Sequence, residues 1–408
     1  MNKNLLFVAF GLVGAMTTPA EAAVQFCFKH NVDFIDSGLE LDSPCDSYSP
    51  ERCEDRWLDN DAYVARGIKA TIQQKVSGVY TEIWSGYVDD GNGTDGAGCT
   101  PDLDPAGVNT GWYKLTLESK AKVNGDYVYV RDASNALAMA TIVSYIGSDN
   151  TTYTYSFSGT SSGLTFERFN VLSAATQPLW YHDFNIAPWV YYYFDVIDSG
   201  SGSQYYTNTG HVEIRSTSTD NSANRKFIIT HEMGHALLHD IVTSKYKNNS
   251  TFTDPGGTCT SATGNNHAVD TKEYQSAAMN EGFAHYYASI AFNRTDQDDC
   301  YFHHWKESRG TVDCEDTGGV LVEAYMLNRC YATSQSGRGV ELDWWRTYWD
   351  LRVKGSVTDQ DMRTWFQTAD SWTDTDVYSK LNAAANDMGG TLNATWDDPA
   401  VPNNRIDF

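Results

Sequence analysis

The sequence predicts an α+β protein in which an N-terminal β-sandwich-like domain is followed by a mainly helical domain. Between residues 62 and 176, short segments of alternating β-branched and aromatic residues recur between clusters of Gly, Asn, Asp and Ser, which is typical of a sandwich of short strands. In the second half of the chain the apolar residues recur mostly at helical spacing. A chain of 408 residues is long enough for two domains, and we place their boundary near residue 175.

The first 22 residues predict a signal peptide. Lys3 precedes an apolar run over 5–16, and Ala20-Glu21-Ala22 fits a small-x-small cleavage site. The run is too short to span a bilayer. We therefore expect an exported protein that begins at Ala23, with a buried N-terminal helix as the alternative.

The cysteines agree with export. Their even number favours disulfides, and their grouping before residue 100 and after residue 258 predicts bonding within two regions. No close CxxC pair is present, which disfavours a thiolate zinc cluster. The eight cysteines are Cys27, Cys45, Cys53, Cys99, Cys259, Cys300, Cys314 and Cys330.

The net charge narrows the possible partners. Lys and Arg number 29 against 53 Asp and Glu, which gives a formal charge of -24 and argues against binding of nucleic acid or anionic membranes. Beyond residue 22 no segment is apolar for long enough to insert into a membrane. The acidic loop 89–96 could hold Ca²⁺, although it lacks the glycine at the sixth position and the closing glutamate of an EF-hand, and a solvated hairpin loop is the alternative.

The pattern assigns the elements in chain order. Residues 23–175 form the β-rich accessory domain and 176–408 the second domain. The predicted strands are 67–76, 80–88, 112–123, 127–131, 137–146, 152–157, 164–171, 189–197 and 211–215. The helices expected near the C-terminus are 319–330, 342–353, 359–368 and 375–388.

The pentapeptide His231-Glu232-Met233-Gly234-His235 predicts a metal site. On a helix, residues four apart share one face about 6 Å apart along the axis, so both imidazoles can bind one ion. In an HExxH motif the two histidines bind zinc and the glutamate accepts a proton from water. Asp220, Asn221 and Ser222 offer N-cap oxygens for this helix, and Gly234 allows another backbone to approach closely. The alternative is a pair of helix histidines that form salt bridges with Glu232.

A catalytic zinc site needs a third protein ligand. His239 lies about 12 Å from His231 along a continuous helix and cannot share the ion. In the segment 277–291, Glu281 and His285 share a helix face with small residues, which permits close packing against the HExxH helix. We therefore expect Glu281 to be the third ligand. His285, His267 and Glu273 are alternatives, as is a core helix in which Glu281 and His285 pair with other side chains.

HEMGH followed downstream by Asn280-Glu281-Gly282-Phe283-Ala284 resembles the gluzincin-type zinc metallopeptidases. The resemblance covers two short motifs between about residues 220 and 292. It implies a zincin-like metallopeptidase domain over 176–408, with His231, His235 and Glu281 as zinc ligands and Glu232 as the general base. It also implies a Tyr or His beyond the second helix that stabilises the oxyanion. Five residues are available for that role: Tyr286, Tyr287, His303, His304 and Tyr325.

Three departures from the family pattern bear on the site. The interval 236–280 is unusually long, which implies an insertion. His285 stands where thermolysin-like enzymes have an aspartate that orients a zinc ligand. The Gly-x-Met-Glu-Asn motif of the aminopeptidases is absent, which favours an endopeptidase.

The function we predict is a secreted, zinc-dependent metallopeptidase that hydrolyses peptide bonds of a protein or peptide substrate through an activated water. The alternative is a secreted binding or adhesion protein with a structural or vestigial zinc site. A third possibility is hydrolysis of another amide, such as cell-wall peptide. The sequence does not indicate whether the protein is a monomer or an oligomer.

Overall fold

The computed structural model describes residues 24–32, 34, 62–89, 98–103, 110–147, 152–157, 164–186, 190–247, 273–292, 339–353 and 355–397. Several predictions lie outside these residues: the signal peptide over 1–22, positions 90–96 of the acidic loop, and the helix expected at 319–330. Also outside them are Cys45, Cys53, Cys259, Cys300, Cys314 and Cys330.

The strands build two sheets. Among the described residues, a three-stranded sheet has the order β2-β1-β8, and an eight-stranded sheet has the order β10-β11-β9-β6-β5-β3-β4, with β7 paired to β5. The strands are β1 (Gln25–Asn31), β2 (Ala62–Val64), β3 (Ile68–Val76), β4 (Val79–Tyr87), β5 (Gly111–Val123), β6 (Asp126–Asp132), β7 (Met139–Ile146), β8 (Thr152–Phe157), β9 (Tyr191–Ile197), β10 (Gln204–Tyr206) and β11 (His211–Arg215).

Alternation of apolar and polar residues determines which face of the large sheet is buried. In β5, every second residue from Tyr113 to Val123 is buried, and the residues between them are partly exposed. The ring of Phe26 in β1 lies 5.2 Å from the ring of Tyr113, so the small sheet contributes to the same core. The disulfide Cys27–Cys99 ties β1 to the segment 98–103. For this pair, the expected bonding within the N-terminal group of cysteines is confirmed.

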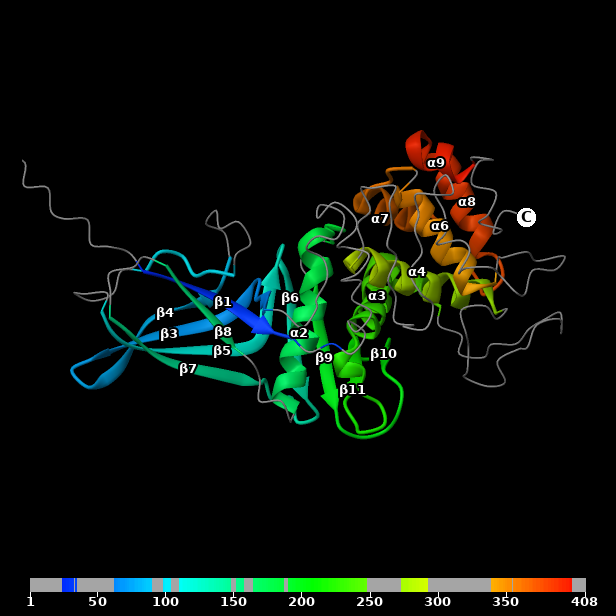
Figure 1. Cartoon of the computed structure of the whole chain (residues 1–408). Helices are drawn as coiled ribbons and strands as arrows, with labels where there is room; N and C mark the ends of the chain where they lie inside the picture. Colours follow the sequence, from blue (N-terminus) through cyan, green and yellow to red (C-terminus); the bar gives the residue numbers. More distant parts are fainter. Residues whose placement is uncertain are drawn as a thin grey trace, which may run out of the picture.

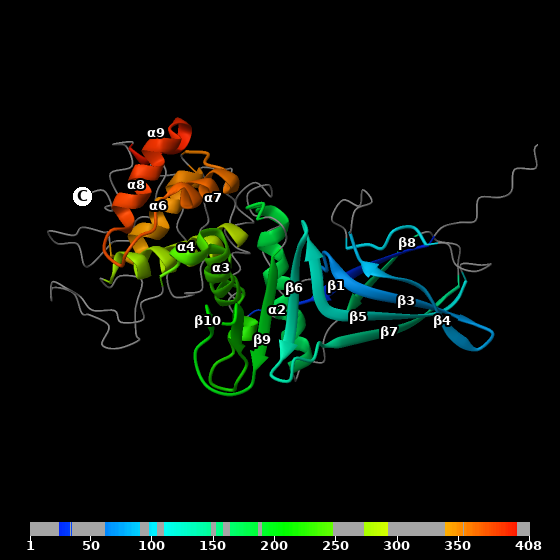
Figure 2. The same ribbon diagram turned by 180° about the vertical axis from the view of Figure 1, so that it is seen from behind.

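The helices follow the sheet region along the chain. They are α2 (Leu164–Tyr181), α3 (Lys226–Val242), α4 (Gln275–Phe292), α6 (Glu341–Val353), α7 (Asp359–Thr368), α8 (Val377–Met388) and α9 (Gly390–Trp396). The long strands lie at one end of the molecule and α6 to α9 at the other (Figure 1; from behind in Figure 2). Mixed α and β content, with a sheet in the N-terminal part and helices in the C-terminal part, agrees with the predicted class. No helix of the described chain is both long and apolar enough to cross a membrane.

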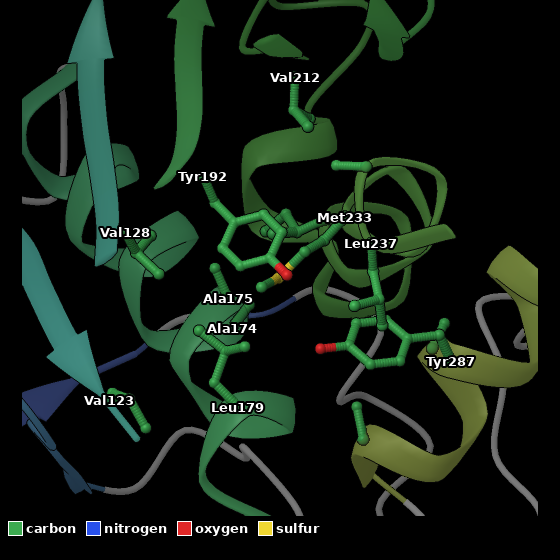
Figure 3. Packing of buried hydrophobic residues seen from close by; sticks show 14 of the residues in the cluster. Val123, Val128, Ala174, Ala175, Leu179, Tyr192, Val212, Met233, Leu237 and Tyr287 are labelled. Carbon is green, nitrogen blue, oxygen red and sulfur yellow. The ribbon is translucent and has the colours of Figure 1, made fainter. Parts of the chain in front are cut away.

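Helix α2 corrects one predicted element. The alternation over 164–171 predicts a strand, but these residues begin a helix that continues past Pro178 to Tyr181. This helix packs against β5 and β6 on one side and against α3 and α4 on the other. Figure 3 shows Ala174, Ala175 and Leu179 between Val128 of the sheet and Leu237 of α3. A helix that is buried on opposite sides loses the one-sided pattern that distinguishes a helix from a strand.

The large sheet continues across residue 175. Strand β9 pairs in parallel with β6, with Tyr191 opposite Tyr127, and β11 pairs in parallel with β9. The strands that precede α3 therefore extend the sheet formed by the N-terminal strands. The division into domains over 23–175 and 176–408 stays a prediction.

Two glycines set the spacing of the helices that follow. A Cβ atom on Gly234 of α3 would lie 2.8 Å from the Cα of Ala284 in α4, so only glycine permits this approach. A Cβ atom on Gly282 would lie 2.8 Å from the carbonyl oxygen of Glu341, where α4 meets α6. Helix α4 is therefore buried from Ser276 to Phe292. The predicted close approach at Gly234 is confirmed.

Candidate metal centre

Helix α3 presents His231, Glu232 and His235, and all three are buried. The expected N-caps are wrong. A 3₁₀ turn over Ser222–Asn224 precedes the helix, which begins at Lys226 without a side-chain cap. The carboxylate of Asp220 instead accepts a hydrogen bond from the backbone N–H of Gly202 at 2.7 Å.

Helix α4 brings Glu281 to the two histidines. Its Oε2 atom lies 3.2 Å from Nε2 of His231 and 3.3 Å from Nε2 of His235. Ligand atoms that share a tetrahedral zinc ion at bond lengths of about 2.0–2.1 Å lie about 3.3 Å from one another. The three ligand atoms all lie within 4.8 Å of one another, and this is the only such group of His, Cys, Asp or Glu that we find in the described part of the chain. These buried residues could therefore hold a metal ion.

Close packing of α4 against α3 explains how the Glu281 side chain reaches His231 and His235. Glu281 lies one turn before Ala284, the residue whose Cα atom contacts Gly234 between the two histidines. Ala277, Ala284 and Ala288 of α4 are buried, so the helix that carries Glu281 has small residues on this face. The small residues that share a helix face with Glu281 in the sequence therefore lie where α4 packs against α3.

Electrostatics favour a neutral imidazole at His231. Burial lowers the pKa of His231 to about 3, and the neighbouring His285 acts in the same direction, while the hydrogen bond to Glu281 opposes the shift. A neutral imidazole has a lone pair available for a metal, whereas an imidazolium has none. The protonation state at neutral pH therefore suits a bound cation.

His285 lies behind His231 rather than among the three ligand atoms. Its Nε2 atom is 3.2 Å from Oε2 of Glu341, its ring stacks on Trp345 with centroids 5.0 Å apart, and its centroid lies 4.4 Å from that of His231. Of the other two alternatives, the structure describes only Glu273, which is not in the group. Glu273 is buried elsewhere, and His267 lies outside the described residues.

The candidates for the oxyanion role divide into two groups. Tyr286 and Tyr287 are fully buried, and both pack against Phe283. Tyr287 also meets Phe184, so core packing accounts for its position. The other three candidates, His303, His304 and Tyr325, lie outside the described residues.

Tyr246 is a residue at this site that the sequence did not indicate. Its hydroxyl lies 3.5 Å from Nδ1 of His235. Burial raises the pKa of the Tyr246 phenol well above its usual value, and the carboxylates of Glu281 and Glu232 add to the shift. The phenol therefore keeps its proton at neutral pH. Tyr246 follows α3 in an irregular stretch, so no periodic pattern connects it with the motif.

No protein-family model matches this chain, and no curated protein matches its sequence significantly.

Proposed function

We propose that this protein is a secreted, zinc-dependent metallopeptidase of the gluzincin type and that it acts as an endopeptidase. One observation carries the proposal: Nε2 atoms of two buried histidines, one helical turn apart, converge on a single carboxylate oxygen of Glu281. Two imidazoles and one carboxylate form a donor set that catalytic zinc sites use, and three protein ligands leave one coordination position open. The disulfide Cys27–Cys99 supports action in an oxidising compartment.

The roles of the residues follow from their positions. His231, His235 and Glu281 would hold the ion. When bound, zinc supplies Lewis acidity, which lowers the pKa of water towards neutrality and polarises a carbonyl group. Glu232 follows His231 directly on α3, and its buried carboxylate accepts the proton of the attacking water and passes it to the leaving amine. The burial of the three ligands limits competing water around the reacting groups.

A strand edge beside α3 supports a peptide substrate. Strand β10 lies at the end of the described sheet order, and its Tyr205 hydroxyl is 2.6 Å from Nδ1 of His239 on α3. An extended peptide can add to such an edge through backbone hydrogen bonds. Recognition through the backbone accepts internal segments of a chain, which agrees with the proposed endopeptidase activity.

The test uses the full chain loaded with zinc and a reduced, alkylated protein as substrate. We expect hydrolysis that a chelator abolishes and that returned zinc restores. Glu232→Gln should keep zinc but lose about 10²–10⁴-fold in rate, because the amide cannot accept a proton. The matched control is Glu118→Gln on the partly exposed face of β5, which should keep the wild-type rate. Wild-type activity in Glu232→Gln would show that the base is assigned wrongly.

The competing proposal is a binding or adhesion protein with a structural or vestigial zinc site. Exposed Trp112 and Tyr145, whose rings lie 5.3 Å apart on the sheet, favour it. Metal coordination separates the two proposals, because a structural site is closed by four protein ligands whereas an enzyme retains a water. X-ray absorption of the zinc-loaded protein that showed four protein ligands would support the binding protein. Hydrolysis of cell-wall peptide without hydrolysis of protein would instead support a different amide substrate.

A further inference from the structure

Tyr246 is held in place by its own segment and by a distant helix. The 3₁₀ turn Thr243–Lys245 connects it to α3, and the Tyr246 N–H donates to the Thr243 carbonyl at 3.1 Å. Lys245 donates from Nζ to the carbonyl oxygens of Phe366 and Gln367, at 3.1 and 2.8 Å, near the C-terminal end of α7. Carbonyl groups at the end of a helix lack intrahelical donors, so a lysine there is a favourable partner. The turn that positions Tyr246 is thus fixed at both ends.

The two nitrogens of His235 face different groups. Nε2 faces Glu281 at 3.3 Å, and Nδ1 faces the Tyr246 hydroxyl at 3.5 Å. A neutral imidazole carries one N–H and one lone pair. Since Nε2 must offer its lone pair to an ion, the proton belongs on Nδ1, and the oxygen of Tyr246 is the acceptor for it. Such a hydrogen bond fixes both the tautomer and the orientation of a ligand ring.

His239 and Tyr205 continue this chain of contacts away from the ion. The His239 ring packs on the ring of Tyr246 with centroids 4.8 Å apart. Nδ1 of His239 lies 2.6 Å from the hydroxyl of Tyr205 in β10. His239 is one turn beyond His235 on α3, which excludes it as a ligand but allows it to support the side chain that contacts His235.

We propose that Tyr246 is a positioning residue for the metal ligand His235, and that His239, held by Tyr205, fixes the ring of Tyr246. The proposal rests on the proposed zinc site. It gives a role to His239, which is not part of the HExxH motif. It also connects the metal ligand His235 to strand β10 at the edge of the sheet. A phenol takes the place that a carboxylate, a carbonyl group or a water has behind most ligand histidines.

The experiment measures metal binding without a substrate. Tyr246→Phe removes only the hydroxyl and keeps the ring on His239. We expect it to weaken zinc binding by about 10–100-fold, as is usual for partners of metal-binding histidines. Competition with a chromophoric chelator gives the affinity. The absorption spectrum of the cobalt-substituted protein reports the geometry of the metal ligands. If Tyr246 contributed only to the stability of the fold, Tyr246→Phe would leave this spectrum unchanged.

Two further variants make the result specific. Tyr286→Phe removes a hydroxyl from a fully buried tyrosine of the core, and we expect it to leave the zinc affinity and the cobalt spectrum unchanged. Tyr205→Phe breaks the contact with His239, and we expect a weakening in the same direction as Tyr246→Phe but smaller. Thermal unfolding of the metal-free proteins shows whether each variant is folded.

The outcomes separate this proposal from the proposed function. If the wild type binds zinc, His235→Ala abolishes binding, and Tyr246→Phe changes neither affinity nor spectrum, then Tyr246 does not position His235 although the zinc site stands. If the wild type binds no zinc, both proposals fall. A weaker affinity and an altered spectrum in Tyr246→Phe alone, with Tyr286→Phe unchanged, would support the positioning role.

Discussion

The sheet region and the helical region both contain buried histidines, and His30 of the first and His231 of the second have different surroundings. Burial lowers the pKa of both His30 in β1 and His231 in α3 to about 3. The ring of His30 is surrounded by the rings of Phe157, Phe166 and Phe169, and its Nδ1 atom lies 2.9 Å from the hydroxyl oxygen of Ser173. His231 instead has two imidazoles and the Glu281 carboxylate beside it.

Burial that lowers the pKa of a histidine therefore does not by itself identify a functional site. Packing among aromatic rings accounts for the place of the His30 imidazole, whose Nδ1 has a hydroxyl partner while its Nε2 has no hydrogen-bond partner among the described residues. Several titratable side chains that converge in one buried place are costly to maintain, so their convergence indicates a function. If the two regions differ in this way, substitutions at the metal centre should affect zinc binding, and substitutions in the sheet should not.

Glu281→Ala should have the largest effect. The substitution leaves two ligands, so we expect zinc affinity to fall by more than about 100-fold, well above the effect expected for a residue that only supports a ligand. In the wild type, free zinc at about 100 times Kd should raise the free energy of unfolding by about 2.7 kcal/mol. Calorimetry with and without zinc measures this gain, and Glu281→Ala should lose it. Glu118→Gln in the sheet should retain it; a zinc-dependent gain in Glu281→Ala would exclude Glu281 as a ligand.

Gly234→Ala should destabilise the contact between α3 and α4. Its Cβ atom would lie 2.8 Å from the Ala284 backbone, which cannot move without shifting α4. We expect the free energy of unfolding to fall by about 1–3 kcal/mol, the usual effect of overpacking. Gly147→Ala is the control in the sheet region, because the nearest atom would be 3.4 Å away. That control should change stability by less than about 1 kcal/mol in denaturant titrations. Equal effects of the two substitutions would contradict the tight contact.

His30 should make the sheet region sensitive to acid. Because its pKa lies near 3 in the folded protein and near 6.5 in the unfolded chain, the unfolded state binds more protons between these values. Its contribution to stability is complete above pH 6.5 and is lost as pH falls towards 3, by up to about 1.4 kcal/mol per pH unit. His30→Asn should flatten the curve of unfolding free energy against pH between 6.5 and 5. An unchanged slope in this variant would show that His30 does not titrate as a buried neutral group.

The outer face of the sheet should give the smallest effect. Tyr127 and Tyr191 face each other across β6 and β9, with ring centroids 5.0 Å apart and an interplanar angle of 7°. A double-mutant cycle with alanine should give a coupling of about 0.5–1.5 kcal/mol, the usual value for an aromatic pair. Neither substitution should alter the zinc affinity. If either substitution weakened zinc binding, the outer face of the sheet would contribute to the metal centre.

The sequence predicted many of the strands and several of the C-terminal helices. The segments 67–76 and 80–88 correspond to β3 (Ile68–Val76) and β4 (Val79–Tyr87), because alternation and turn residues determine such hairpins locally. The segments 342–353, 359–368 and 375–388 likewise correspond to α6, α7 and α8, within one or two residues at each end. Local pattern fails at α2, which is covered on opposite sides and therefore has no polar stripe.

The site was predictable only in part. His231 and His235 follow from helical spacing, and Glu281 from its place among small residues on another helix, and the structure brings all three together. Tyr246 could not be predicted, because its position depends on Lys245 binding the end of α7, more than a hundred residues away. The extension of the sheet by β9 and β11 was also missed, since parallel pairing between strands that other elements separate along the chain leaves no local signal.

Because the large sheet continues across residue 175, cleavage of the chain near this position should not separate its two parts. Proteolysis in the interval between β6 and β9 would sever the chain, but the backbone ladder from Tyr127–Tyr191 to Asp132–Val196 would still hold the two pieces together. Removing the first piece would take β6 away from β9 and leave an unpaired hydrogen-bonding edge on that side of β9. A nicked molecule should therefore travel as one particle in gel filtration and separate only in denaturant.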